Sequence, residues 1–126
     1  NKSMAQLLID RGADIEARYY IDELTPLSLT VRAGNKSMAQ LLIDRGADIE
    51  ARCYKDNLTP LSRAVREGKE YMVELLINKG ADIKTQDGDG LNLLQQAAER
   101  GHGAVEQMLY TEARYQGYEY PSTVDE

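Results

Sequence analysis

An internal repeat constrains the fold of this chain more than any other feature of its sequence. The 18 residues from Asn1 to Arg18, NKSMAQLLIDRGADIEAR, occur again without change from Asn35 to Arg52, at an offset of 34 residues. A looser third copy, KEYMVELLINKGADIKTQ, begins at Lys69 at the same offset. Self-similarity at a period of this size is typical of proteins that stack one structural unit several times. The sequence therefore predicts a repeat array rather than a single globule.

The composition favours thin helical layers over one large core. At 126 residues the chain has the length of one domain. It contains no Phe and no Trp, and its apolar share is 42%. The core must therefore come mainly from Leu, Ile, Val, Ala and Met, which suits the narrow space between short helices.

Charge and residue counts exclude several classes of protein. Lys and Arg number 15 against 21 Asp and Glu, a net charge of −6, so we expect no nucleic-acid partner. A single cysteine and a single histidine exclude an internal disulfide and a Cys/His metal cluster. No stretch approaches the roughly 18 apolar residues of a membrane span. The chain has no signal-like start and no Met at position 1, so we expect a piece of an intracellular protein, cytoplasmic or nuclear, without a membrane partner.

Capping residues in the second unit predict a short helix over residues 36–45. Asn35 is a good N-cap residue and stands just before apolar side chains at helical spacing. Gly46 follows at the place where a left-handed C-cap is expected. The next segment, 47–57, is polar and long enough for an extended excursion with a tight turn.

A second helix signal follows that loop. Thr59 suits the N-cap and Pro60 the first helical position, where its missing N–H costs nothing, and Gly68 ends the helix. The same pattern starts at Thr25 and, with Asn in place of Thr, at Asn92. Each unit is therefore predicted to be helix, turn, helix and extended loop. Isolated helices below about 12–15 residues are marginal in water, so these must bury their apolar sides on one another.

Short motifs recur at matching places in these units: Thr-Pro-Leu at 25–27 and 59–61, Gly-Ala-Asp-Ile at 12–15, 46–49 and 80–83, turn glycines at 34, 68 and 101, and the hairpin turn Asp89-Gly90. With these motifs the units resemble ankyrin repeats. The resemblance covers residues 1 to about 110 and implies an all-α ankyrin-repeat solenoid of stacked helix-turn-helix units with protruding hairpin loops.

The chain also departs from the family's pattern. The first two hairpins are one residue longer than the third, and Glu23 and Asn57 stand where the family prefers Gly. Asn tolerates a positive φ and Glu does so poorly, so we expect bulged or longer hairpin tips at 19–22 and 53–56. The hydrogen bonds that tie the loop in the family must be weaker or different here, because its usual His is replaced by Ser28, Ser62 and Gln95.

The pattern divides the chain into a truncated unit, three further segments and a tail. Because the chain begins at a second helix whose apolar side lacks its covering helix, we expect end-to-end self-association through that helix. We expect some of the tyrosine rings at positions 110, 115, 118 and 120 to cover part of the last helix, with a docking or phosphotyrosine peptide as the alternative. The expected segments are residues 1–23 (second helix and hairpin of the truncated unit), 24–56 and 57–89 (repeats), 90–114 (C-terminal repeat or cap) and 115–126 (polar, Tyr-rich tail).

Candidates for chemistry are few. The segment 87–90, Asp-Gly-Asp-Gly, lacks the ligand positions of a calcium loop and is predicted to be a tight turn. Cys53 is predicted to be a surface thiol at a hairpin tip. His102 stands at a helix start, where the family commonly carries His, and is predicted to be structural. We predict no catalysis, no cofactor and no metal, because a catalytic acid pair would need a closed apolar pocket and a solenoid offers a groove.

The resemblance implies that the first helices and the hairpin tips line a concave face that binds another protein. Arg and Tyr, the types enriched at binding hot spots, gather on this side of an acidic chain. We therefore expect a protein or peptide partner of acidic character, although arginine at a helix end can also serve the helix dipole and solubility alone. The candidate residues are Arg18, Tyr19, Tyr20, Ile21, Arg32, Arg52, Tyr54, Lys55, Arg63, Arg66 and Arg100.

A second hypothesis is architectural. The identity of the first two units favours a spacer or self-associating segment of a longer array without a specific ligand, because binding surfaces usually differ from unit to unit.

Overall fold

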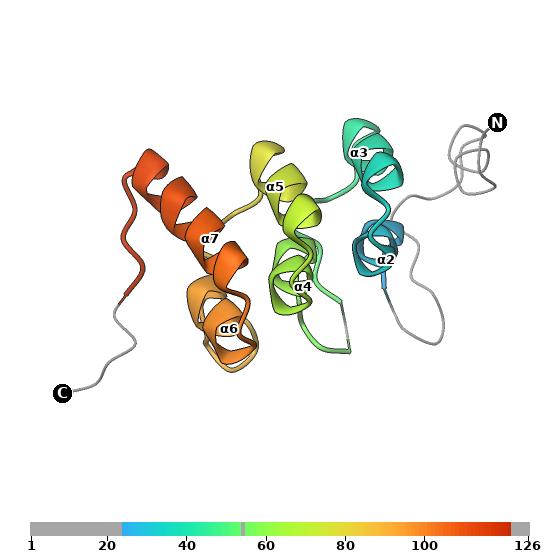
Figure 1. The fold of residues 1–126 in the computed structure, drawn as a ribbon. Coiled ribbons are helices and arrows are strands. Elements are labelled where there is room, and N and C mark those ends of the chain that lie inside the picture. Colours follow the sequence, from blue (N-terminus) through green and yellow to red (C-terminus); the bar gives the residue numbers. More distant parts are fainter. Residues whose placement is uncertain (1–23, 54, 122–126) are drawn as a thin grey trace.

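Three pairs of helices lie side by side in the computed structural model, which describes residues 24–53 and 55–121 (Figure 1). The first unit, which the sequence predicts to be truncated, lies outside these ranges. So do the predicted bulge at 19–22 and the helix expected to mediate self-association. The helices of the described residues are α2 (Pro26–Ala33), α3 (Lys36–Asp44), α4 (Pro60–Arg66), α5 (Glu70–Asn78), α6 (Leu93–Glu99) and α7 (Gly103–Gln116).

The helices form two rows along the stack. Each unit pairs a first helix with a second, as α2 with α3, α4 with α5 and α6 with α7. Neighbouring units contact one another through the first helices α2, α4 and α6, and separately through the second helices α3, α5 and α7 (Figure 1). The prediction of an all-α solenoid is therefore confirmed.

The predicted N-caps start the helices as expected. The side chain of Thr25 accepts a hydrogen bond from the backbone N–H of Ser28, and Thr59 does the same for Ser62, with Pro at the first helical position of both helices. Asn35 caps α3 in the same way. At α6, Asn92 and Gln95 form a full capping box, in which each side chain accepts a hydrogen bond from the other residue's backbone N–H. Gln95 is one of the residues that replace the family's usual His.

The tight turns between paired helices depend on glycine. Gly34, Gly68 and Gly101 have φ values of 73°, 68° and 73°, in the left-handed region that other residues rarely adopt. Gly68 has a second constraint, because the ring of His102 lies so close that an added Cβ would be 2.7 Å from its Cε1 atom. His102 Nε2 lies 3.0 Å from the backbone oxygen of Arg66, which supports the predicted structural role of this histidine.

Leucines at equivalent positions form the centre of the stack. Leu42, Leu76 and Leu109, one from each second helix, are at most 1% exposed. Each belongs to a cluster of buried side chains that runs continuously through the units. The burial explains why helices of seven to nine residues persist here although they would not persist alone.

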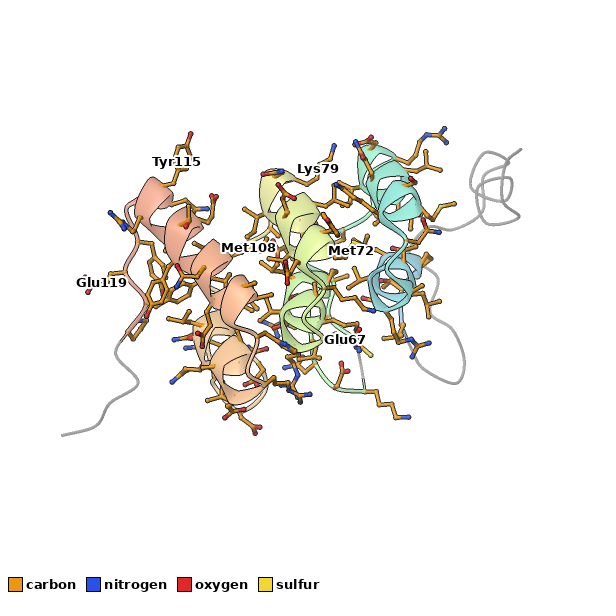
Figure 2. All side chains as sticks on the ribbon, in the orientation of Figure 1. Glu67, Met72, Lys79, Met108, Tyr115 and Glu119 are labelled. Carbon is orange, nitrogen blue, oxygen red and sulfur yellow. The ribbon has the colours of Figure 1, made fainter. Side chains whose placement is uncertain are left out.

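After α7 the chain turns back along the outer end of the stack (Figure 1). The Tyr120 hydroxyl donates a buried 2.8 Å hydrogen bond to the backbone oxygen of Ile83. The Tyr118 and Tyr120 rings meet edge to face, and Lys84 Nζ lies 5.0 Å from the centre of the Tyr118 ring. Tyr115, by contrast, projects into solvent from the end of α7 (Figure 2). Two tyrosines of the expected tail thus contact residues 83 and 84, in the segment between α5 and α6.

Candidate partner-binding surface

Two consecutive hairpins and the ends of two first helices surround a charged pocket of about 400 Å³. We call it the inter-hairpin pocket. It lies on the side of the stack that carries the first helices and the loops between units, which is the side predicted to bind a partner. Its charged residues are three arginines, Arg63, Arg66 and Arg100, and four acids, Asp56, Glu67, Asp87 and Asp89.

Arg63 is largely committed to contacts within the protein. Its side chain is 9% exposed, and Nη2 donates a 2.6 Å hydrogen bond to Oδ2 of Asp56 in the preceding hairpin. Nη1 lies 3.8 Å from a carboxylate oxygen of Glu67, one helical turn later. The buried Nε–H has no hydrogen-bond acceptor among the described residues. Arg63 therefore fixes the hairpin to α4, and most of its guanidinium is hidden from a partner.

Arg66 links α4 to the hairpin that follows α5. Its Nη1 donates to Oδ2 of Asp87 at 3.3 Å. The other carboxylate oxygen of Asp87 accepts the backbone N–H groups of Asp89 and Leu91, each at 2.9 Å, so this side chain also shapes the hairpin turn. The predicted tight turn at 87–90 is confirmed, since the N–H of Gly90 bonds back to the carbonyl of Asp87. Arg66 is only half-buried, yet its charge is partly neutralised by Asp87 within the protein.

The other predicted site residues differ in their surroundings. Arg52 Nη1 donates to the backbone oxygens of Asn57 (2.8 Å) and Gln86 (3.1 Å) and so connects two hairpins. Arg32, Lys55 and Arg100 are exposed. Of the predicted residues that the structure describes, Arg63, Arg66 and Arg100 line the inter-hairpin pocket and the others do not. The remaining candidates lie outside the described residues: Arg18, Tyr19, Tyr20, Ile21 and Tyr54.

A comparison between units explains the unequal pairing of charges in the pocket. Asp56 and Asp89 precede their helix caps by the same interval, so they occupy equivalent positions 33 residues apart. The equivalent of Arg63 is Gln96, a buried amide that donates to the carbonyl of Leu91 and accepts from the Ser62 hydroxyl. Asp89 therefore lacks the arginine that its counterpart has. The sequence shows that Gln96 stands in place of Arg63, but only the structure shows that Arg63 pairs with Asp56. The four acids of the pocket were not among the predicted site residues.

The predicted position of Cys53 is wrong, because the thiol is buried at 2% exposure rather than placed on the surface. Its backbone N–H donates to the carbonyl of Leu58, as the N–H of Asp87 does to that of Leu91. Cys53 is thus the counterpart of Asp87, whose side chain also lies buried. Asn57, where the family prefers Gly, has the expected positive φ of 60°.

A larger hollow, of about 640 Å³, lies at the C-terminal end of the stack. It is lined by the outer sides of α6 and α7 and by residues 118–121. None of the predicted binding residues that lie within 24–53 and 55–121 lines it.

Residues 24–53 and 55–121 hold no group of three or more His, Cys, Asp or Glu side chains that could bind a metal ion. Among the helices of this same part, none is both long and apolar enough to cross a membrane.

The architecture defines a class of protein, the helical repeat solenoid, and the sequence identifies the family. The family model "Ankyrin repeats (3 copies)" matches residues 1–87, more than half of the chain, so the chain belongs to the ankyrin repeat family. A comparison with curated proteins gives no match. Ankyrin repeats are generally protein–protein interaction modules and are typically not catalytic.

Proposed function

We propose that this chain binds a protein or peptide on the face formed by its first helices and hairpins, and that it has no catalytic activity of its own. The inter-hairpin pocket is the observation that carries the proposal. It brings Arg63, Arg66 and Arg100, which are up to 37 residues apart in the sequence, to one surface depression.

Differences between units favour a specific ligand over a plain spacer. The buried positions of the first helices repeat, as in Leu61 with Leu94 and Ala64 with Ala97. The pocket-lining position at the end of the helix does not repeat, since it is Glu67 in one unit and Arg100 in the next. A spacer would need only the buried positions, whereas a binding surface uses such differences to select its partner.

The contacts that each arginine makes within the protein determine which residues a binding test should alter. Arg66 is tied to Asp87, so replacing it would disturb the hairpin as well as any contact with a partner. Arg32 and Arg100 are exposed near the ends of first helices and are better probes. Lys36 and Arg114, exposed on second helices, make a control pair with the same change of charge.

The test is selection of peptides from a random library displayed on phage. We expect the wild-type chain to enrich peptides whose binding is weakened by the double substitution Arg32→Glu and Arg100→Glu. The control Lys36→Glu and Arg114→Glu should retain binding, and circular dichroism should show equal helical content in all three proteins. Enriched peptides that bind both double variants equally would refute the assignment of this face.

A further inference from the structure

We infer that the inter-hairpin pocket accepts a segment of mixed charge, with a basic side chain close to an acidic one, rather than a uniformly acidic segment. This inference rests on the proposed function and specifies the chemistry of the partner. It follows from the charges that remain after the internal ion pairs of the pocket are formed.

Ion pairs within the protein neutralise most of the pocket's charge. Arg63 is paired with Asp56 and lies near Glu67, and Arg66 is paired with Asp87. A partner gains little from groups whose hydrogen bonds are already made, because it would have to break those bonds to form its own.

Within residues 24–53 and 55–121, two opposite charges of the pocket are left without an ion pair. Arg100 and Asp89 form no ion pair with any residue of the described chain, and both are exposed at the edge of the pocket. Asp89 is unpaired because Gln96 replaces the arginine that its counterpart Asp56 contacts. A partner that covered the pocket would have to neutralise both groups, since a charge that is buried without a partner is costly.

The total charge of the pocket argues against a purely acidic ligand. Four carboxylates face three guanidinium groups, which gives a net charge of −1. A second acid in the ligand would lie near Asp89 and Glu67, and neither has a strong ion pair to offset the repulsion. A basic side chain there would be attracted to both, whereas an acid suits Arg100.

The buried Arg63 adds nothing to these requirements, because most of its guanidinium is hidden from a partner. The pocket therefore requires an anion and a cation from one short segment.

The experiment uses the same displayed random peptide library with single neutral substitutions. The variants are Asp89→Asn and Arg100→Gln, and the control is Glu99→Gln, an exposed neighbour that does not line the pocket. We expect enriched peptides to carry a Lys or Arg within a few residues of an Asp or Glu. Synthetic versions should bind each pocket variant about two- to fivefold more weakly, as for an exposed ion pair, and should bind the control like the wild type.

The outcomes separate this inference from the proposed function. Peptides of one charge sign, sensitive to Arg100→Gln but not to Asp89→Asn, would overturn the mixed-charge inference and leave the proposed face in place. Peptides insensitive to both substitutions and to the double substitution of Arg32 and Arg100 would overturn both. Failure to enrich any peptide would also count against both.

Discussion

Replacement of Gly68 by alanine tests how much the contact between Gly68 and the His102 ring stabilises two neighbouring units. Gly34, Gly68 and Gly101 occupy the same turn in consecutive units with nearly the same φ, but only Gly68 has the His102 ring against it. Alanine in the left-handed conformation costs about 1 kcal/mol at each position. At Gly68 the new methyl group must also displace the ring and break its contact with the Arg66 carbonyl, a hydrogen bond of about 1 kcal/mol.

The expected result is a difference between otherwise matched variants. Gly34→Ala and Gly101→Ala should lower the free energy of unfolding by about 1 kcal/mol, and Gly68→Ala by about 2 to 3 kcal/mol, as measured by urea denaturation followed by circular dichroism. The double variant Gly68→Ala, His102→Ala should lose less free energy of unfolding than the two single variants lose together, by about 1 kcal/mol, because each substitution removes the same contact. Equal losses for the three glycines would show that the ring contact has no energetic effect.

Four further predictions concern single side chains and the contacts that each one makes. Ser62→Ala should lower the free energy of unfolding by about 1 kcal/mol, because the Ser62 hydroxyl donates to a buried amide oxygen. Ser28→Ala should be neutral or stabilising, because the Ser28 hydroxyl has no partner in the described chain. Urea denaturation compares the two variants. Asp87→Ala should cost about 2 kcal/mol in the same assay, since a buried carboxylate that holds two backbone N–H groups and an arginine is lost. Tyr120→Phe should cost about 1 kcal/mol through its lost hydrogen bond, and Tyr115→Phe, at an exposed position, should cost nothing measurable. Burial raises the pKa of the Tyr120 phenol well above its usual value of about 10, so above that pH only the unfolded chain loses this proton; the stability of the wild type should therefore fall more steeply from pH 10 to 11 than that of Tyr120→Phe.

The helices were predictable because local chemistry fixes where a helix starts and stops. Thr59 offers an oxygen to a free backbone N–H, Pro60 lacks the N–H that would go unused, and Gly68 adopts a conformation that other residues avoid. None of these effects depends on a distant part of the chain. The same holds for Asn57, whose positive φ follows from its place in the turn.

The state of the candidate site was not predictable in this way. Arg66 and Asp87 are 21 residues apart in the sequence, and only the tertiary fold brings their side chains to 3.3 Å. The sequence identifies the arginines of this face but does not show which of them are already paired. It likewise does not show that Cys53 faces inward, because the side toward which a hairpin residue points depends on the unit packed against it.

The sequence by itself determined the repeat period, the ends of the helices and the family, because these follow from caps, turn residues and apolar spacing within one unit. The tertiary structure alone decided which charges remain for a partner. Arg63 and Arg66 are engaged by carboxylates, while Arg100 and Asp89 have no ion pair within the described chain. The physical reason is that ion pairing depends on distance in space, and in a stacked array that distance is set between units.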